Sequence, residues 1–365
     1  MMRLRGVNCC LAARTRTSLQ ICLDKTSIGG WKTVTEFTSK FEDLATLTKR
    51  GLVLTLSFIL LAGCGGTQPT GEGALHAIPQ AARAAHADRA KPWMLPGAKS
   101  EDLLYIATGD NVYVLSYPGG KLTGSLNVAG YELCADEKGD VFVPQTADST
   151  IFVYAHGGDS PIRTLSDGDQ PLGCAVDPIT GNLAVTNEGS GAGEVAIYRH
   201  ARGTAQWYQD EAIGQYGLCG YDDQGNLFLD GTGTSNVFAE LPRGSDTFKN
   251  FTLGARFVAY GSVQWDGTFI TLSNPSAHAI YRLKILKTTF KVTGTTHLHQ
   301  WRNGYSGNWP YIETWLQNGT FLAQSSSAAD VGLWPYPAGG NPSKVIGGFK
   351  SGSATVYGVT ISLAR

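Results

Sequence analysis

Short apolar segments separated by glycine-rich turns recur along the chain from Leu103 to its end. In each copy an apolar segment leads to an aspartate or a similar polar residue, then to a tight turn with glycine, and then to a second alternating segment. Alternation of apolar and polar residues with a period of two indicates half-buried β-strands. The copies occupy residues 131–143, 171–185, 216–229, 261–272, 311–323 and 357–365.

The distance between the copies is typical of the blades of a β-propeller. Helical repeats of similar length would show helical periodicity, and these copies do not. The spacings are 40, 45, 44, 50 and 46 residues when the anchors are taken as Cys134, Cys174, Cys219, Val263, Glu313 and Val359.

The remainder of each copy predicts two further strands, so that each blade has four. A third strand such as residues 194–199 follows a polar loop, and a turn rich in glycine and proline, such as residues 156–161, leads to the outer strand. The first copy begins at a second strand, Asp102–Ala107, and the last ends after a first strand, Tyr357–Ser362. The sequence therefore predicts an all-β, six-bladed propeller over residues 101–365, closed by pairing of the C-terminal strand with the N-terminal strands.

Composition and charge agree with this fold and restrict the partners. The chain contains 46 Gly, 15 Tyr and 14 Phe, which favours a turn-rich β protein. Residues 1–63 hold 9 Lys+Arg and 4 Asp+Glu, which leaves 20 basic and 26 acidic residues in 64–365, a difference of −6. A mildly acidic body lacks the basic face that binds phosphates, so no nucleic-acid partner is expected.

The N-terminal excess of positive charge belongs to an export signal. Lys49 and Arg50 precede the apolar run 51–60, which is too short to span a membrane. The next residues, 61–64, read Leu-Ala-Gly-Cys and resemble the lipobox of bacterial lipoproteins. This resemblance implies that Cys64 carries the lipid anchor after cleavage, which would hold the exported protein at the cell envelope. The alternative is an apolar core segment that happens to end in cysteine.

The segments around this signal are predicted to lie outside the folded body. Residues 1–48 show no clear periodicity and are predicted to be a gene-model extension, with translation starting close to Leu47. Residues 49–63 are the predicted lipoprotein signal peptide. Residues 64–100 are rich in alanine, glycine and proline and are predicted to form a flexible tether.

Three cysteines stand at corresponding places in successive copies. We expect Cys134, Cys174 and Cys219 to be buried free thiols that pack between blades, because a small apolar side chain suits such a place. Equivalent positions in adjacent blades need not bring two sulfurs within disulfide range. A single disulfide and a catalytic nucleophile are the alternatives.

Other polar residues repeat in a manner typical of structural roles. Aspartates at the first turn of each copy can accept backbone hydrogen bonds and fix the hairpin. His156 and His200 fall at the outer turn, and His297 with His299 gives only a weak metal signal. The chain has no G-x-S-x-G, P-loop or H-E-x-x-H motif. The turn aspartates are Asp136, Asp177, Asp222 or Asp223, and Asp266.

Residues that differ between copies mark the predicted ligand-binding face. They lie in loops that enter the first strand or join the second strand to the third, where propellers usually bind ligands. Aromatic and amide side chains there suit a sugar or a peptide, although the tyrosines before each first strand could instead fill space between blades. The candidates are Tyr131, Glu132, Asn187, Glu188, Tyr216, Asp230, Tyr260, Asn274, Trp309 and Tyr311.

The body resembles NHL-type and gluconolactonase-like six-bladed propellers, and extracytoplasmic propeller lipoproteins of bacteria in particular. The resemblance rests on the aspartate and Gly-Asn-Leu pattern in Gly173–Val185 and Gly217–Leu229, and it is specific for fold rather than activity. Gluconolactonase-like enzymes hold a divalent metal with Glu, Asn and Asp. By residue type, Glu132, Asn187 and Asp230 would be the nearest equivalents.

Two classes of function follow. The leading hypothesis is a lipid-anchored, monomeric binding or scaffold propeller that takes a small ligand or a protein partner and needs no cofactor, because no catalytic set is evident. The alternative is a metal-dependent lactonase or hydrolase with its site at the mouth of the central channel.

Overall fold

The computed structural model describes part of the chain, and all of that part falls in the compact unit Pro69–Arg365. The predicted signal peptide, Cys64 and the predicted extension lie outside the described residues. Within the described part, no helix has the length and apolar composition that crossing a membrane requires. The described residues are 76–77, 91–188, 194–233, 236–253, 257, 261–299, 314–317, 320–325, 330–347 and 356–365.

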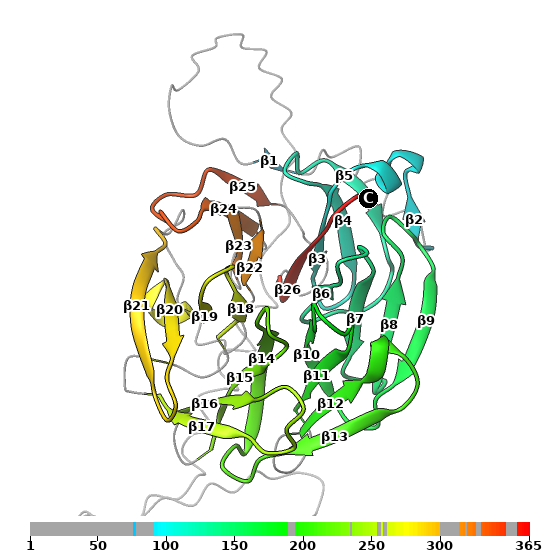
Figure 1. Ribbon diagram of the computed structural model, residues 1–365. Helices are drawn as coiled ribbons and strands as arrows, with labels where there is room; N and C mark the ends of the chain where they lie inside the picture. Colours follow the sequence, from blue (N-terminus) through cyan, green and yellow to red (C-terminus); the bar gives the residue numbers. More distant parts are fainter. Residues whose placement is uncertain are drawn as a thin grey trace, which may run out of the picture. The chain divides into compact units, whose positions relative to one another are not determined.

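The described strands form six sheets around a common centre (Figure 1). Four of the sheets have four antiparallel strands in chain order, which we number as blades 1 to 4. Blade 1 contains β6 (Cys134–Ala135), β7 (Val141–Gln145), β8 (Thr150–Tyr154) and β9 (Pro161–Ser166). Blade 2 contains β10 (Pro171–Val176), β11 (Leu183–Asn187), β12 (Glu194–Tyr198) and β13 (Ala205–Gln209). Blade 3 contains β14 (Gln215–Tyr221), β15 (Leu227–Thr232), β16 (Asn236–Leu241) and β17 (Lys249–Thr252). Blade 4 contains β18 (Val263–Trp265), β19 (Ile270–Asn274), β20 (Ala279–Ile285) and β21 (Phe290–His297).

The other two sheets each carry one additional outer strand. Blade 5 contains β22 (Thr314–Gln317), β23 (Thr320–Ser325), β24 (Asp330–Pro335) and β25 (Lys344–Gly347), and β1 (His76–Ala77) runs parallel to β25. Blade 6 contains β26 (Gly358–Ser362), β3 (Leu103–Ala107), β4 (Val112–Ser116) and β5 (Leu122–Ser125), and β2 (Trp93–Met94) pairs with β5. The described residues also contain three short 3-10 helices, η1 (Pro96–Ser100), η2 (Arg199–Ala201) and η3 (Pro275–Ala277).

Blade 6 closes the ring with strands from both ends of the propeller. β26 pairs with β3 in antiparallel register from Gly358 opposite Ala107 to Ser362 opposite Leu103. The innermost strands β6, β10, β14, β18, β22 and β26 contact one another in a closed cycle. The all-β propeller and its closure by the C-terminal strand are therefore confirmed.

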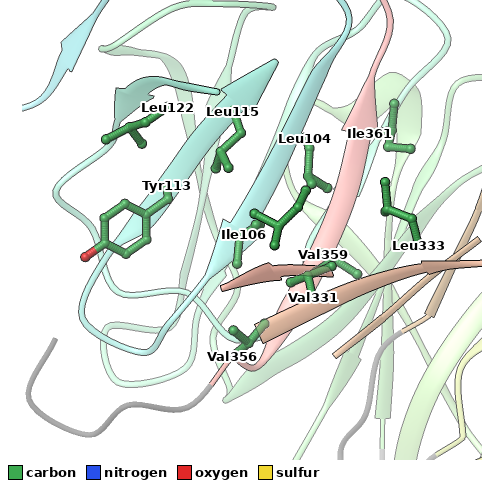
Figure 2. Packing of buried hydrophobic residues seen from close by; sticks show 11 residues of the cluster. Leu104, Ile106, Tyr113, Leu115, Leu122, Val331, Leu333, Val356, Val359 and Ile361 are labelled. Atoms are coloured by element: carbon green, nitrogen blue, oxygen red, sulfur yellow. The ribbon is translucent and has the colours of Figure 1, made fainter. Parts of the chain in front are cut away.

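The closing strand is also held by apolar packing against blade 5. Figure 2 shows Val359 and Ile361 of β26 together with Ile106 of β3, near Val331 and Leu333 of β24. All five side chains are almost completely buried. Since burying one such side chain contributes about 1.5–3 kcal/mol, this cluster stabilises the point where the chain ends meet.

The folded body begins earlier than the predicted tether boundary at residue 100. Trp93 and Met94 of β2 lie opposite Ser125 and Gly124 of β5, and Ala98 of η1 is buried. β2 satisfies the backbone groups that the outer edge of β5 would otherwise expose. A Cβ atom on Gly124 would lie 2.2 Å from the sulfur of Met94, so the missing side chain makes room for this strand.

The prediction of three free thiols is wrong for two of them. Cys134 of β6 and Cys174 of β10 form a disulfide with a Cα–Cα distance of 5.7 Å, whereas the buried Cys219 forms none. Cys134 stands two residues before its turn aspartate, Asp136, whereas Cys174 stands three residues before Asp177. The register of β6 with β7 and of β10 with β11 agrees with this offset. Successive side chains of a strand point to opposite faces, so this offset turns Cys134 toward the neighbouring blade.

Candidate functional site

The ring has two faces that differ in the connections they carry. We call the loop face the side with the loops that enter the innermost strands and those that join second to third strands. The turn face carries the hairpin turns between first and second strands and between third and fourth strands. Our sequence-based candidates all belong to the loop face.

The structure describes seven of the ten candidates on the loop face. Tyr260, Trp309 and Tyr311 lie outside the described residues. Tyr131 is 37% exposed and Glu188 is half-buried, so these two are accessible on this face. The buried candidates are Glu132, Asn187, Tyr216, Asp230 and Asn274.

Asp230 joins the innermost strands of two neighbouring blades. Its Oδ1 accepts a hydrogen bond from the backbone N–H of Leu218 at 3.0 Å, and its Oδ2 accepts one from Gly261 at 2.6 Å. Thr186, at the same place in blade 2, donates to the carbonyl of Gly217 at 2.7 Å. The side chain at this position of the second strand therefore holds adjacent blades together.

These contacts bear on the divalent metal that the gluconolactonase-like resemblance implies. Both carboxylate oxygens of Asp230 already accept backbone hydrogen bonds, and Glu132 is only 1% exposed. Among the described residues, no group of three or more His, Cys, Asp or Glu side chains is arranged to hold a metal ion. A channel metal site formed by Glu132, Asn187 and Asp230 stays a prediction.

Other candidates on the loop face make local structural contacts. Asn274 Oδ1 accepts the backbone N–H of Ala277 at 3.0 Å and caps η3. Tyr216 is fully buried beside Phe248, with ring centroids 6.2 Å apart, as a space-filling residue would be. Burial raises the pKa of Tyr216, which keeps its hydroxyl neutral.

The accessible candidates each have a neighbour on this face. Tyr131 meets Tyr357 edge to face, with centroids 4.8 Å apart. Glu188 Oε1 accepts a hydrogen bond from Gln215 Nε2 at 2.9 Å. A ligand-binding role for these residues stays a prediction.

The central channel contains a cavity of about 390 Å³ that reaches the turn face. Its walls come from the innermost strands of blades 1 to 5, and Glu137 and Pro178 place one end at the first hairpin turns. Apart from the carboxylate of Glu137 at the turn-face end and the hydroxyl of Ser262, its polar side chains are aromatic or carboxamide side chains. They are Tyr221, Trp265, Trp315, Gln264 and Gln317.

Two hydrogen bonds of Gln264 fix the shape of this cavity. Its Nε2 donates to the carbonyl of Thr314 at 2.7 Å, and its Oε1 accepts the backbone N–H of Leu316 at 2.6 Å. The side chain thus joins β18 to β22 across a blade boundary. The walls are held in place by the fold itself, as in most preformed ligand pockets.

Trp315 extends across the centre of the ring. It belongs to blade 5, yet it packs both against the cluster at the junction of blades 5 and 6 and against the cluster that contains Cys134 and Cys174. Its Nε1 donates to Gln317 Oε1 at 3.2 Å. Trp315 and Trp265 are both half-buried, so each indole has surface available to a ligand in the cavity.

The channel residues are not among the sequence-based candidates, although one signal for them is present in the sequence. Tyr221 and Trp265 both stand one residue before the turn aspartate of their blades. Two aromatic residues at one position of the innermost strand could have indicated a lined channel. Apolar alternation in that strand fits a packed core equally well, so the pattern alone does not separate the two interpretations.

The comparisons with known proteins agree with the fold. No protein-family model matches the chain, and no curated protein does. Among solved structures, the chain is similar to a chain in the crystal structure of a nidogen/laminin complex, with a TM-score of 0.56 and 13% identity over 72% of this chain and 99% of that chain.

Two further similarities have a TM-score of 0.47. One is to the Cps50 (Swd1) β-propeller domain of Myceliophteria thermophila, with 8% identity over 72% of this chain and 87% of that chain. The other is to a chain of a mitotic checkpoint complex, with 12% identity over 85% of this chain and 93% of that chain. The likeness to the nidogen/laminin complex chain, at 13% identity, shows the fold alone. The chain is a β-propeller.

Proposed function

We propose that the chain is a lipid-anchored extracytoplasmic β-propeller that binds a small ligand in its central channel and performs no chemistry on it. The channel cavity carries this proposal, because it combines two indoles and two carboxamides in a frame fixed by Gln264. Its volume of about 390 Å³ is within the range of small-molecule pockets.

The chemistry of the channel walls favours a neutral saccharide over other small ligands. Indole faces pack against the apolar faces of sugar rings, and carboxamides can donate to and accept from sugar hydroxyls. Burial raises the pKa of Tyr221 far above its ordinary value, so its hydroxyl presents no charge to the cavity. A protein partner at the turn face would be the other type of occupant.

Tryptophan fluorescence can test this proposal on the full chain. Titration with a panel of neutral mono- and oligosaccharides should give a saturable change for at least one of them. The affinity should fall at least about tenfold in Trp265→Ala and in Trp315→Leu, since each removes a stacking surface. Trp207→Ala is the matched control, because Trp207 is exposed on the outer strand β13. Absence of saturable binding, or equal affinity in all four proteins, would contradict a channel site.

Two observations support the location in the cell envelope. Residues 61–64 resemble a lipobox that ends at Cys64. The Cys134–Cys174 disulfide is typical of oxidising compartments, because cytosolic thiols are kept reduced.

Lipid attachment at Cys64 predicts a change in partitioning. Wild-type protein expressed in a bacterium should enter the detergent phase of Triton X-114, and Cys64→Ser should move to the aqueous phase because it lacks the acceptor sulfur. Cys22→Ser, which lies in the predicted extension, should behave as wild type. An unmodified Cys64 peptide in the mass spectrum of the mature protein would contradict the anchor.

We do not favour the metal-dependent lactonase, because Asp230 uses both carboxylate oxygens to join blades. Metal analysis of protein purified without chelator distinguishes the two functions. A stoichiometric divalent ion that is lost in Glu132→Gln would support the lactonase instead.

A further inference from the structure

A second cavity, of about 510 Å³, lies on the turn face between blades 1 and 2. It touches the channel cavity, because both are lined by Ala135, Glu137, Val176 and Pro178. We call it the groove. Its walls come from the β6–β7 turn and β9 of blade 1, and from the β10–β11 turn and η2 of blade 2. Its cationic and histidine side chains are Lys138, Arg163, His200, Arg202 and Arg365.

Two of the carboxylates in the groove are engaged by their own turns. Asp136 Oδ1 accepts the backbone N–H groups of Lys138 at 2.9 Å and Asp140 at 2.8 Å. Asp177 Oδ1 accepts the N–H of Ile179 at 2.9 Å, and Asp177 Oδ2 accepts the hydroxyl of Thr180. These bonds confirm the hairpin role predicted for the turn aspartates, and they orient both carboxylates toward their own turns.

The groove cations form no ion pair within the described part of the chain. The ion pairs there join Lys249 to Glu240 and Arg282 to Asp266. None of these four residues lines the groove. Burial and the charge of Asp136 raise the pKa of Asp140, whereas Arg163, Lys138 and Arg202 act in the opposite direction. Asp140 is half-buried among these three cations. The whole groove lining carries four cationic side chains and four carboxylates, the latter being Asp136, Glu137, Asp140 and Asp177.

Two groove side chains are already oriented. Arg163 Nη1 donates to the carbonyl of Ala201 at 3.1 Å, which ties β9 to η2 and leaves the other guanidinium N–H groups for a further acceptor. His200 Nδ1 lies 2.7 Å from the carbonyl oxygen of Thr180, so Nδ1 carries the proton and the ring is fixed. A guanidinium held in this way is suited to binding an oxyanion through two parallel hydrogen bonds.

We propose that the groove binds the oxyanion, a carboxylate or a phosphate, of a small hydroxylated molecule. Arg163, Arg202 and Lys138 hold the anionic group, and Asp140 accepts hydrogen bonds from the hydroxyls of the ligand. This site uses none of the channel indoles, so its test does not depend on whether the channel binds a saccharide.

Isothermal titration calorimetry of the full chain tests the groove with three related probes. Galacturonate carries a carboxylate, galactose 6-phosphate carries a phosphate, and galactose is neutral. One or both anions should bind saturably in the groove, more weakly at high salt, and galactose should show no binding that depends on the groove cations. The stronger anion identifies the oxyanion class. Binding of inorganic sulfate as tight as that of the sugar acids would overturn the proposal, because it would show no recognition of the hydroxylated part.

Matched variants decide whether the groove is responsible. Arg202→Ala removes an exposed side chain and should weaken anion binding about tenfold or more. Arg163→Lys keeps the charge, loses the planar fork, and should also weaken binding. Arg243→Ala is the control, since Arg243 is exposed on the corresponding turn of blade 3 and lines neither cavity. Anion binding that is absent in wild type, or unchanged in Arg202→Ala with an unchanged thermal melt, would overturn the site.

Discussion

At the scale of single residues, a one-position offset decides which cysteines pair. The position two residues before the turn aspartate in one blade approaches the position three residues before it in the next. Cys134 and Cys174 occupy such a pair, and so do Gly220 and Val263, where a Cβ on Gly220 would lie 2.2 Å from the carbonyl oxygen of Val263. Ala175 stands at the corresponding place and packs against the cluster that contains Cys219.

This geometry predicts that Ala175→Cys forms a second disulfide, with Cys219. The mass should fall by about 2 Da relative to the reduced variant, and thiol labelling in denaturant should find neither residue, because Cα atoms within about 7 Å can be bridged. The double variant Ala175→Cys/Cys219→Ser is the control, and its residue 175 should react with the thiol label. Full labelling of both cysteines in the single variant would show that the two positions do not face each other.

The native disulfide should make a measurable contribution to stability. It links residues 40 positions apart, and closing a loop of this length contributes up to about 4 kcal/mol to the free energy of unfolding. Cys134→Ala/Cys174→Ala should therefore melt several degrees below wild type. A reductant should lower the melting temperature of wild type but leave that of the double variant unchanged. If the reductant shifts both proteins equally, the effect does not come from this bond.

At the scale of elements, neighbouring blades are joined by polar side chains at one position of the second strand. Asp230 accepts the backbone N–H of Leu218 in its own blade and that of Gly261, which precedes β18 of the next blade. Thr186, at the same position in blade 2, donates to the carbonyl of Gly217 in blade 3 at 2.7 Å. Strands of different blades do not share a sheet, so their backbone groups at these junctions depend on side-chain partners. The innermost strands hold their spacing through these bonds.

Asp230→Ala should therefore destabilise the protein by about 2–5 kcal/mol, because it leaves two buried N–H groups without this acceptor. Denaturation by urea measures the change in the free energy of unfolding. Asp223→Ala, an exposed carboxylate in the adjacent turn, is the control and should have little effect. If Asp230→Ala is as stable as wild type, Asp230 does not have this structural role. It would then be a candidate for ligand binding.

At the scale of the whole molecule, the propeller depends on both ends of its chain. β26 supplies the innermost strand of blade 6, contacts β6 and β22, and contributes Val359 and Ile361 to the cluster shared with blade 5. A gap at this point would expose strand edges and apolar surface on two blades at once. Closure is thus the step that couples all blades into one cooperative unit.

Truncation after residue 354 removes β26 and should sharply lower the melting temperature. The truncated protein should also bind a dye that reports exposed apolar surface. Truncation after Leu363 keeps β26 and is the control, expected to melt close to wild type. A melt unchanged by the longer truncation would contradict closure by this strand.

The sequence by itself determined the propeller fold and the turn aspartates, because both follow from contacts within hairpins whose residues are close in sequence. It also determined the closure of the ring, because the first copy begins at a second strand and the last copy ends after a first strand. Only the tertiary structure decided the disulfide, the place of β2, the channel cavity and the groove. These features depend on how residues of different blades face one another, and that changes with a single-residue offset in the strand register. Cys134 is the clearest example. Its place in the repeat predicts a position equivalent to that of Cys174, but the register of β6 turns it toward Cys174, and the two form a disulfide.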